Sequence, residues 1–211
     1  SDVPTAVALL KEGVENGLHP GAQLVVQQEG SLRVDVAVGN VAVDSLLHWF
    51  SATKPLAAVA LGQLWERGAL RLDDPVCRYI HEFAAAEKND VTLRHLLTHT
   101  GGFRSRLDLE WGDVSWEDAI GQVCAARKER RWPTGRKAGY HIASSWYALG
   151  EVVCRIDGRP YDQYVREEIF LPLGMSDCWL SMSEDRYSDY GARLASVYNT
   201  EGSLAVEPVS Y

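Results

Sequence analysis

The 211-residue chain lacks several features that mark whole classes of protein. It has only four cysteines and no CxxC pair, which excludes a zinc ribbon and a thioredoxin-like redox motif. No apolar run approaches the roughly 20 residues that a transmembrane helix needs, so we expect no membrane span. The first residues have neither a basic start nor an apolar stretch, so no signal peptide is visible, although a leader removed earlier would leave no trace here.

Positive charge is also scarce. Lysine and arginine together number 21 against 29 acidic residues, a formal net charge of −8. The largest basic cluster is residues 127–131, so a nucleic-acid partner is not expected. With 46% apolar residues the chain can bury a core as one large or two small domains. The four thiols are expected to be reduced and mostly buried, which favours a cytoplasmic protein.

The first fifty residues predict a helix and a β-hairpin. Asp2 is placed to cap a helix that has Pro4 in its first turn and ends near Gly17. Two short apolar runs, 23–28 and 32–38, flank the turn-forming residues 29–31, as in a hairpin. We expect these elements to form the N-terminal part of a sheet.

Helical spacing dominates the middle of the chain, and strand-like pieces return near its end. The helical patterns cover 52–67, 92–99, 115–128, 143–156 and 160–170, and the strand-like pieces are 178–180, 194–198 and 204–206. This order predicts an α+β fold in three parts. They are an N-terminal helix and hairpin (1–50), a helical domain (51–175) and the start of a returning, incomplete sheet region (176–211).

A Ser-x-x-Lys motif opens the first of the long helical patterns. Pro55 is tolerated only near the start of a helix, so Ser51 is expected at the helix N-terminus, where free N–H groups favour a developing anion. Lys54 follows one turn along on the same face. A lysine beside apolar neighbours is pushed towards its neutral form and can accept the serine proton. The motif alone equally suits a capping serine beside a solvated lysine.

The sequence around this motif resembles the serine β-lactamase and penicillin-binding-protein superfamily. The resemblance is nearest to its class C β-lactamase-like branch, which also holds esterases, D-aminopeptidases and acyltransferases. It rests on residues 49–55 with 63–76, then 91–102, 132–150 and 169–175, which follow one another in the family's order. Residues 91–102 are similar to the branch's LLTHTSG segment.

The resemblance implies a β-lactamase/transpeptidase-like fold, in which a helical domain lies beside an antiparallel sheet. It implies that Ser51 is the acylated nucleophile, that Lys54 is its base and that Tyr140 relays a proton to the leaving group. It implies no metal and no cofactor. The expected partner is a small-molecule acyl substrate.

Two departures from the family pattern bear on the substrate. Ile142 stands where the family's Tyr-x-Asn motif has an asparagine that hydrogen-bonds the substrate amide, which weakens a β-lactamase or peptidase reading. His141 and Ile142 are expected to contact the substrate in a more apolar pocket. The family's later Lys/His-Thr/Ser-Gly motif has no match after Tyr140. Its letters occur at residues 99–101, which precede the tyrosine and belong to another segment.

The missing motif predicts that the chain lacks the C-terminal strands and helix of the fold. The absent strand also supplies one oxyanion donor, which alone can contribute about 10²–10³ in rate. We therefore expect a second chain, or a separate segment, to complete the site.

Hydrolysis of a small ester is the favoured function. Acyl transfer to a small-molecule acceptor is the alternative, followed by hydrolysis of a β-lactam or D-amino-acid peptide. A binding module with an incomplete site is the non-enzyme alternative. No GxSxG elbow is present, which disfavours an α/β-hydrolase. His48 could act as base in place of Lys54, and the pair His95 and His99 could hold a metal, but a helix-end histidine pair is the simpler interpretation.

Overall fold

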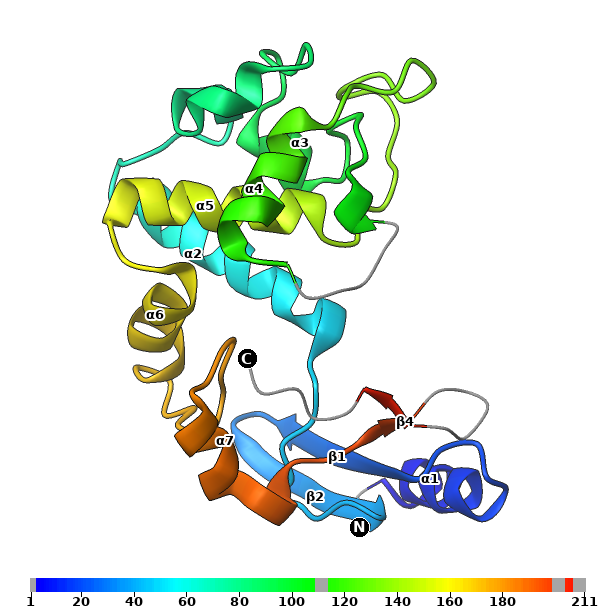
Figure 1. The fold of residues 1–211 in the computed structure, drawn as a ribbon. Coiled ribbons are helices and arrows are strands. Elements are labelled where there is room, and N and C mark those ends of the chain that lie inside the picture. Colours follow the sequence, from blue (N-terminus) through cyan, green and yellow to red (C-terminus); the bar gives the residue numbers. More distant parts are fainter. Residues whose placement is uncertain (1–2, 109–113, 199–203, 207–211) are drawn as a thin grey trace. The chain divides into compact units, whose positions relative to one another are not determined.

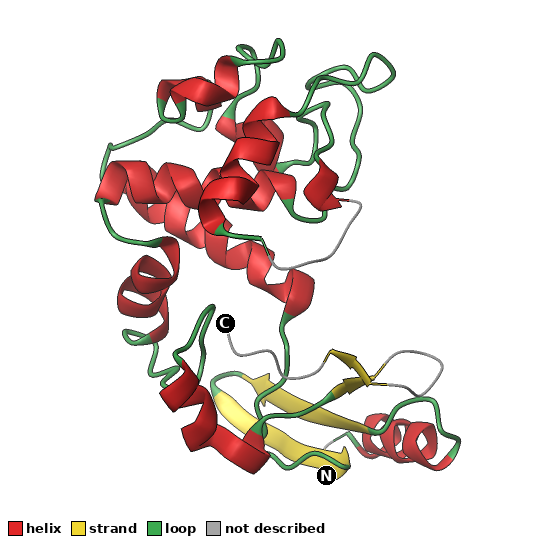
Figure 2. Ribbon diagram, viewed as in Figure 1, coloured by secondary structure: helices red, strands yellow, loops and turns green. Residues whose placement is uncertain are grey.

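A computed structural model describes residues 3–108, 114–198 and 204–206, and the chain divides into two compact units. Unit 1 is formed by Ser1–His48 with Ser181–Tyr211, and unit 2 by Trp49–Leu180. In the described ranges, the strands belong to unit 1, and unit 2 is built from helices and turns (Figures 1 and 2). The main elements are α1 (Pro4–Glu15), β1 (Gly21–Gln28), β2 (Ser31–Gly39), the 3-10 helix η1 (Phe50–Thr53), α2 (Lys54–Glu66), α3 (Leu93–Leu97), α4 (Trp116–Ala125), α5 (Ser144–Asp157), α6 (Tyr161–Val165), the π-helical turn η5 (Arg166–Phe170), α7 (Glu184–Tyr190), β3 (Val197–Tyr198) and β4 (Leu204–Val206).

The β-hairpin predicted from the sequence is confirmed. Strands β1 and β2 pair antiparallel, from Gly21 opposite Gly39 to the turn end of the hairpin. The two loop residues, Glu29 and Gly30, have φ of 51° and 75°. Positive φ at both positions is the geometry that matches the twist of the strands in a two-residue hairpin. The side chains of Val25 and Leu32 remain largely exposed, so the hairpin carries apolar surface that the described residues do not cover.

The rest of unit 1 agrees with the sequence prediction only in part. The expected cap Asp2 lies outside the described residues, and α1 begins at Pro4 without a side-chain cap. The sequence did not reveal α7, which Ser183 caps by accepting a hydrogen bond from the N–H of Arg186. Antiparallel pairing of β3 with β4 falls within the strand-like pieces 194–198 and 204–206.

Residues 178–180, predicted as a strand, are not one. The guanidinium of Arg166 donates to the carbonyls of Ser176 and Cys178 at 2.8 and 3.0 Å, and it lies 3.7 Å from the ring centroid of Trp179. The Cys178 carbonyl, which would pair with a neighbouring strand, therefore accepts from an arginine side chain instead. A run of three apolar residues is too short to distinguish a strand from an apolar loop.

The hydrophobic core lies in unit 2, where α5 packs along α2 (Figure 1). The helices end where the sequence predicted, because Gly68 and Gly158 adopt positive φ just after α2 and α5. Both helices bury one apolar face, and α4 and the turns before it close the core. Its fully buried members include Ala60, Leu61, Val76, Phe83, Leu93, Leu96, Phe103, Leu149, Val152, Val153 and Tyr164.

One lysine lies entirely inside this core. Lys88 is 0% exposed, and its ammonium donates to the carbonyls of Ala85, Cys124 and Ala126 at 3.0, 2.7 and 2.5 Å. The nitrogen also lies 5.0 Å from the ring centroid of Phe83. Cys124 and Ala126 belong to the C-terminal end of α4, where backbone carbonyls lack partners within the helix. Lys88 therefore caps the C-terminal end of α4 with its side chain.

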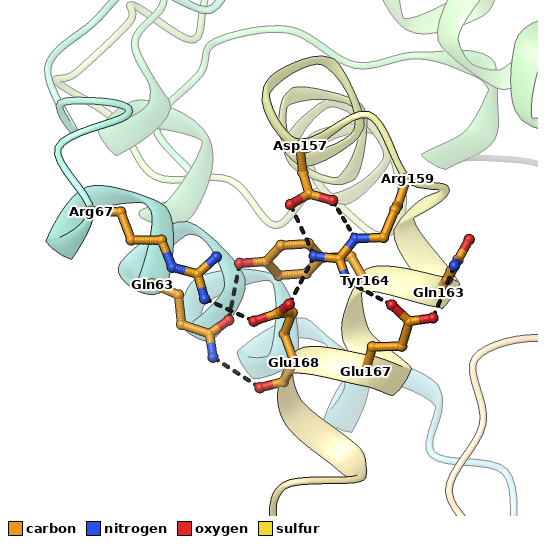
Figure 3. Close-up of polar contacts among 8 residues, drawn as sticks. All are labelled: Gln63, Arg67, Asp157, Arg159, Gln163, Tyr164, Glu167 and Glu168. Carbon is orange, nitrogen blue, oxygen red and sulfur yellow. Dashed lines mark hydrogen bonds and ion pairs between the residues drawn. The ribbon is translucent and has the colours of Figure 1, made fainter.

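A polar network fastens α2 to the segment that joins α5 to η5 (Figure 3). Arg159 binds both carboxylate oxygens of Asp157, and it contacts Glu167 and Glu168 at 2.6 and 2.8 Å. Glu168 also accepts from Arg67 of α2 at 2.8 Å, and its backbone carbonyl accepts from Gln63. Because α2 begins at Lys54, this network holds the helix that carries the Ser-x-x-Lys motif.

Replacing Arg159 by Met is expected to destabilise unit 2 by about 1–2 kcal/mol, since three carboxylates lose their shared cation. Arg159 lowers the pKa of Asp157 and Glu168, so the stabilisation is fully present above about pH 5 and is lost as the pH falls through their folded-state pKa values. Urea unfolding at pH 7 and pH 3 measures this. The control Arg130→Met changes an exposed arginine and should have little effect. An equal loss in R159M and R130M would contradict the prediction.

All four cysteines are free, but the prediction that they are mostly buried is wrong: Cys124 is buried, and Cys77, Cys154 and Cys178 are half-buried. In the described ranges, no helix is both long and apolar enough to cross a membrane.

Candidate active site

Ser51 is the second residue of η1, a 3-10 turn that runs directly into α2. The residue before it, Phe50, has φ of 45°, a left-handed conformation that bulky residues rarely adopt. Thr53 Oγ1 donates to the Phe50 carbonyl at 2.8 Å and supports this backbone. Backbone N–H groups in a first helical turn lack partners within the helix, so the Ser51 N–H is available for an oxyanion. Strain of this kind is characteristic of functional sites.

Lys54, the first residue of α2, contacts Ser51 directly. Its Nζ lies 2.9 Å from Ser51 Oγ. Two aromatic faces enclose the amine, with the ring centroids of Tyr140 and Trp146 at 5.0 and 5.7 Å. Across the ranges that the structure describes, Lys54 has no carboxylate partner. The amine is therefore directed to the serine rather than held in an ion pair.

Tyr140 comes from a distant part of the chain and completes the group. Its hydroxyl donates to Ser51 Oγ at 2.7 Å across 89 residues of sequence. The hydrogen bond with Ser51, together with the nearby Lys54 amine, lowers the pKa of the Tyr140 phenol below its usual value of about 10. The side chain is 52% exposed, so the reacting edge of the group is open to solvent. The structure thus brings together the three side chains that the resemblance implies as catalytic.

The two residues expected to contact substrate lie in different environments. His141 is 1% exposed, and its ring lies 4.9 Å from that of Phe103 and 4.8 Å from that of Trp132. Burial lowers the pKa of His141 to about 4, so the imidazole is neutral. Ile142 is 37% exposed. The exposed Ile142 is open to a ligand, whereas the position of His141 favours support of the adjoining Tyr140 over direct contact.

His95 and His99, considered above as a metal pair, make separate contacts. His95 Nδ1 accepts from the N–H of Thr92 at the start of α3, and Thr92 caps that helix in return. His99 instead accepts from the N–H of His141 and lies against the Tyr140 ring. In the described part of the chain, no group of three or more His, Cys, Asp and Glu side chains is arranged to hold a metal.

Asp108 supports the Tyr140 segment, although nothing in the sequence analysis singled it out. Helix α5 has no side-chain cap of its own, but Asp108 Oδ1 accepts from the N–H groups of Ala143 and Ser144 at 2.8 and 3.0 Å. Its other oxygen accepts from the N–H of Ser105. Burial alone would raise the pKa of Asp108, but these hydrogen bonds outweigh it and lower the pKa. The spacing Ser105-x-x-Asp108 resembles a local cap, which was the available signal.

A family model described as beta-lactamase matches residues 6–203 of the chain. The chain belongs to the beta-lactamase family. Esterase EstB of Burkholderia gladioli is 32% identical over 165 residues, which cover 69% of this chain and 41% of the esterase. Other family relatives are named acyltransferase, penicillin-binding protein and beta-lactamase. Membership places the chain among β-lactamase-like serine hydrolases, as the resemblance predicted.

Solved structures of the family show the same fold. The crystal structure of a penicillin-binding protein homologue from Caulobacter crescentus is 30% identical, with a TM-score of 0.74 over 92% of this chain and 54% of that one. A family VIII carboxylesterase is 26% identical, with a TM-score of 0.71 over 90% of this chain and 54% of that one. The α+β, β-lactamase/transpeptidase-like fold is thereby confirmed. The chain spans about two fifths of the length of the curated relatives and about half of these solved chains.

Proposed function

We propose that this chain carries the nucleophile, base and proton donor of a serine hydrolase that forms an acyl-enzyme on small esters. The observation that carries the proposal is that Lys54 Nζ and Tyr140 OH both lie within hydrogen-bond distance of Ser51 Oγ. A nucleophilic hydroxyl needs an adjacent base, and a departing alkoxide needs a proton. Lys54 can act as that base and Tyr140 as that proton donor, and both contact the same serine oxygen.

The proposed reaction passes protons between Ser51, Lys54 and Tyr140, and it leaves each of them in its starting state. Lys54 takes the Ser51 proton as Oγ bonds to the ester carbonyl carbon, and the Ser51 N–H donates to the oxyanion. The bond to the leaving oxygen then breaks, Tyr140 protonates that oxygen, and Lys54 returns a proton to Tyr140. Water next adds to the acyl carbon while one of its protons passes to Lys54. The carbon–Oγ bond breaks, and that proton restores the Ser51 hydroxyl.

We propose an ester rather than an amide substrate because of Ile142 and because some similar proteins are named as esterases. Ile142 is exposed beside the group and offers a substrate amide no hydrogen-bond partner from its side chain, whereas an ester requires none. Esterase EstB and a family VIII carboxylesterase are among the similar proteins. Acyl transfer to a small-molecule acceptor is the second candidate. It differs in whether an alcohol or amine reaches the acyl-enzyme before water, and an acyltransferase of Penicillium decumbens is 28% identical.

We further propose that a second chain, or a separate segment, supplies the remaining strand motif and the second oxyanion donor. The chain aligns with only about half of its solved relatives, and the hairpin of unit 1 exposes Val25 and Leu32. The competing hypothesis is a binding module that has kept the fold with an incomplete site.

A serine-reactive fluorophosphonate tests the proposal. The protein is incubated with the probe, denatured and weighed intact, and its peptides are mapped. We expect one adduct on Ser51, none in the variant Ser51→Ala, and the mass of any companion chain in the same spectrum. An unmodified chain that appears alone would sink the enzyme proposal for these residues. Survival of ligand binding in S51A, with no turnover in the unaltered protein, would favour the binding module.

A further inference from the structure

His99 brackets Tyr140 on both sides along the chain. Its backbone carbonyl accepts from the N–H of Gly139 at 2.9 Å, and its ring Nδ1 accepts from the N–H of His141 at 3.0 Å. The face of the His99 ring lies against the Tyr140 ring, with 4.8 Å between centroids. Three contacts from one residue therefore hold the residue before Tyr140, Tyr140 itself and the residue after it.

The backbone of His99 is bent to make these contacts. Its φ is 58°, in the left-handed region, at the point where the chain leaves α3. Non-glycine residues occupy this region at an energetic cost, so surrounding contacts must maintain it. The edge of the ring also meets Trp146 at 5.5 Å between centroids, and Trp146 donates from Nε1 to the His141 carbonyl. His99 is thereby held between α3 and the start of α5.

The hydrogen bond from His141 determines the tautomer of His99. A ring nitrogen that accepts a hydrogen bond carries no proton, so the single proton of the neutral ring resides on Nε2. Partial burial, and then the nearby charge of Lys54, lower the pKa of His99, while the Asp108 carboxylate opposes this shift. The ring is therefore neutral at pH 7.

We propose that His99 is a positioning residue that holds Tyr140 against Ser51, and that only its neutral form can do so. The effect on rate rests on the proposed function, whereas the effect on Tyr140 itself does not. Protonation places a hydrogen on Nδ1, and the His141 N–H then loses its acceptor. The imidazolium also faces the amine of Lys54. Both changes release the segment that carries Tyr140.

This inference predicts an acidic limb in the reactivity of Ser51. The groups facing His99 are Lys54 of α2, Tyr140 and His141 of the segment before α5, and Asp108. Because the pKa of His99 is lowered, reactivity should be complete above pH 6.5 and should fall as the pH drops through the folded-state pKa of His99. Burial lowers the pKa of the neighbouring His141 to about 4, and the variants below separate its titration from that of His99.

Two substitutions at His99 separate positioning from simple loss of structure. His99→Ala removes the acceptor and the ring, so we expect the rate of Ser51 phosphonylation at pH 7.5 to fall about 30- to 100-fold. Asparagine tolerates positive φ, and its Oδ1 can accept from the His141 N–H but does not titrate. His99→Asn should therefore recover at least tenfold over H99A and should lack the acidic limb. His95→Asn, which changes a histidine of α3 four residues before His99, is the control and should keep the limb.

Equal losses in H99A and H99N, or an acidic limb that persists in H99N, would overturn the proposal. The pKa of Tyr140, measured by NMR with ¹³Cζ-labelled tyrosine, gives a readout that needs no reaction. It should rise towards 10 in H99A and stay lowered in H99N and H95N. If Ser51 never reacts in the unaltered protein, the proposed function fails, and the Tyr140 titration still decides the role of His99. An unchanged Tyr140 pKa in H99A would refute that role.

Discussion

Replacing Lys54 by Met is expected to lower kcat/KM for a small ester about 10³-fold at pH 7.5. Lys54 Nζ lies 2.9 Å from Ser51 Oγ, and the amine has no carboxylate partner in the described ranges. Without it, the Ser51 proton must pass to water as the bond to the carbonyl carbon forms, and general-base assistance is worth about 10²–10⁴ in rate. Methionine keeps the length and apolar stem of the side chain, so the aromatic contacts with Tyr140 and Trp146 are largely preserved.

The stability of K54M should differ from that of the unaltered protein by less than about 1 kcal/mol, because a single partly exposed hydrogen bond is lost. Steady-state hydrolysis of a nitrophenyl ester and urea unfolding measure the two effects. Lys137→Met is the matched control, since Lys137 is an exposed lysine whose amine, among the described residues, donates only to the backbone carbonyl of Arg131. If K54M kept more than a tenth of the activity, another base would be required, and His48 would be the first to test.

Replacing Lys88 by Met should lower the stability of the protein and leave the reactivity of Ser51 unchanged. Lys88→Met is expected to destabilise unit 2 by about 3–5 kcal/mol while the surviving folded molecules keep their reactivity at Ser51. Burial lowers the pKa of Lys88 to about 8, so the ammonium persists at pH 7, where its three protons match three carbonyl acceptors. Methionine fits between the aromatic rings but leaves those carbonyls without a donor, at about 1–3 kcal/mol each.

The turn before Lys88 also indicates that the hydrogen bonds of its ammonium stabilise unit 2. Ala86 and Glu87 have φ of 57° and 63°, so two consecutive non-glycine residues adopt the left-handed conformation immediately before it. Such strain costs about 1–2 kcal/mol per residue and persists only where later contacts offset it. The three hydrogen bonds of the ammonium provide that offset.

Linkage gives an independent check of the Lys88 prediction. The folded-state pKa lies below the unfolded value, so between about pH 8 and 10 the unfolded chain binds a proton that the folded chain does not. The stability of the unaltered protein should therefore rise with pH in that range relative to K88M. Urea unfolding of both proteins at pH 7, 8, 9 and 10 measures the difference. A stability gap below 1 kcal/mol at pH 7, or one that shrinks as the pH rises, would contradict this account.

The sequence by itself determined the features that depend on neighbouring residues. The pair Ser51 and Lys54 could be placed because three residues span one turn of helix, and Pro55 restricts where that helix begins. The hairpin around Glu29 and Gly30 followed from an equally local rule, since its two loop residues supply the positive φ that the turn requires. Tyr140 could be named only through the family resemblance, because its 89-residue separation from Ser51 has no periodicity to reveal it.

Tertiary packing alone decided what surrounds these residues. Asp108 caps α5 across 35 residues, and His99 meets His141 across 42. Lys88 points inward because the end of α4, 36 residues away, presents free carbonyls to it. A sequence pattern records which side chains can donate, accept or titrate, but their partners depend on how the core brings distant segments together. The supports of Tyr140 and the interior cation therefore emerge only once the helices of unit 2 are packed.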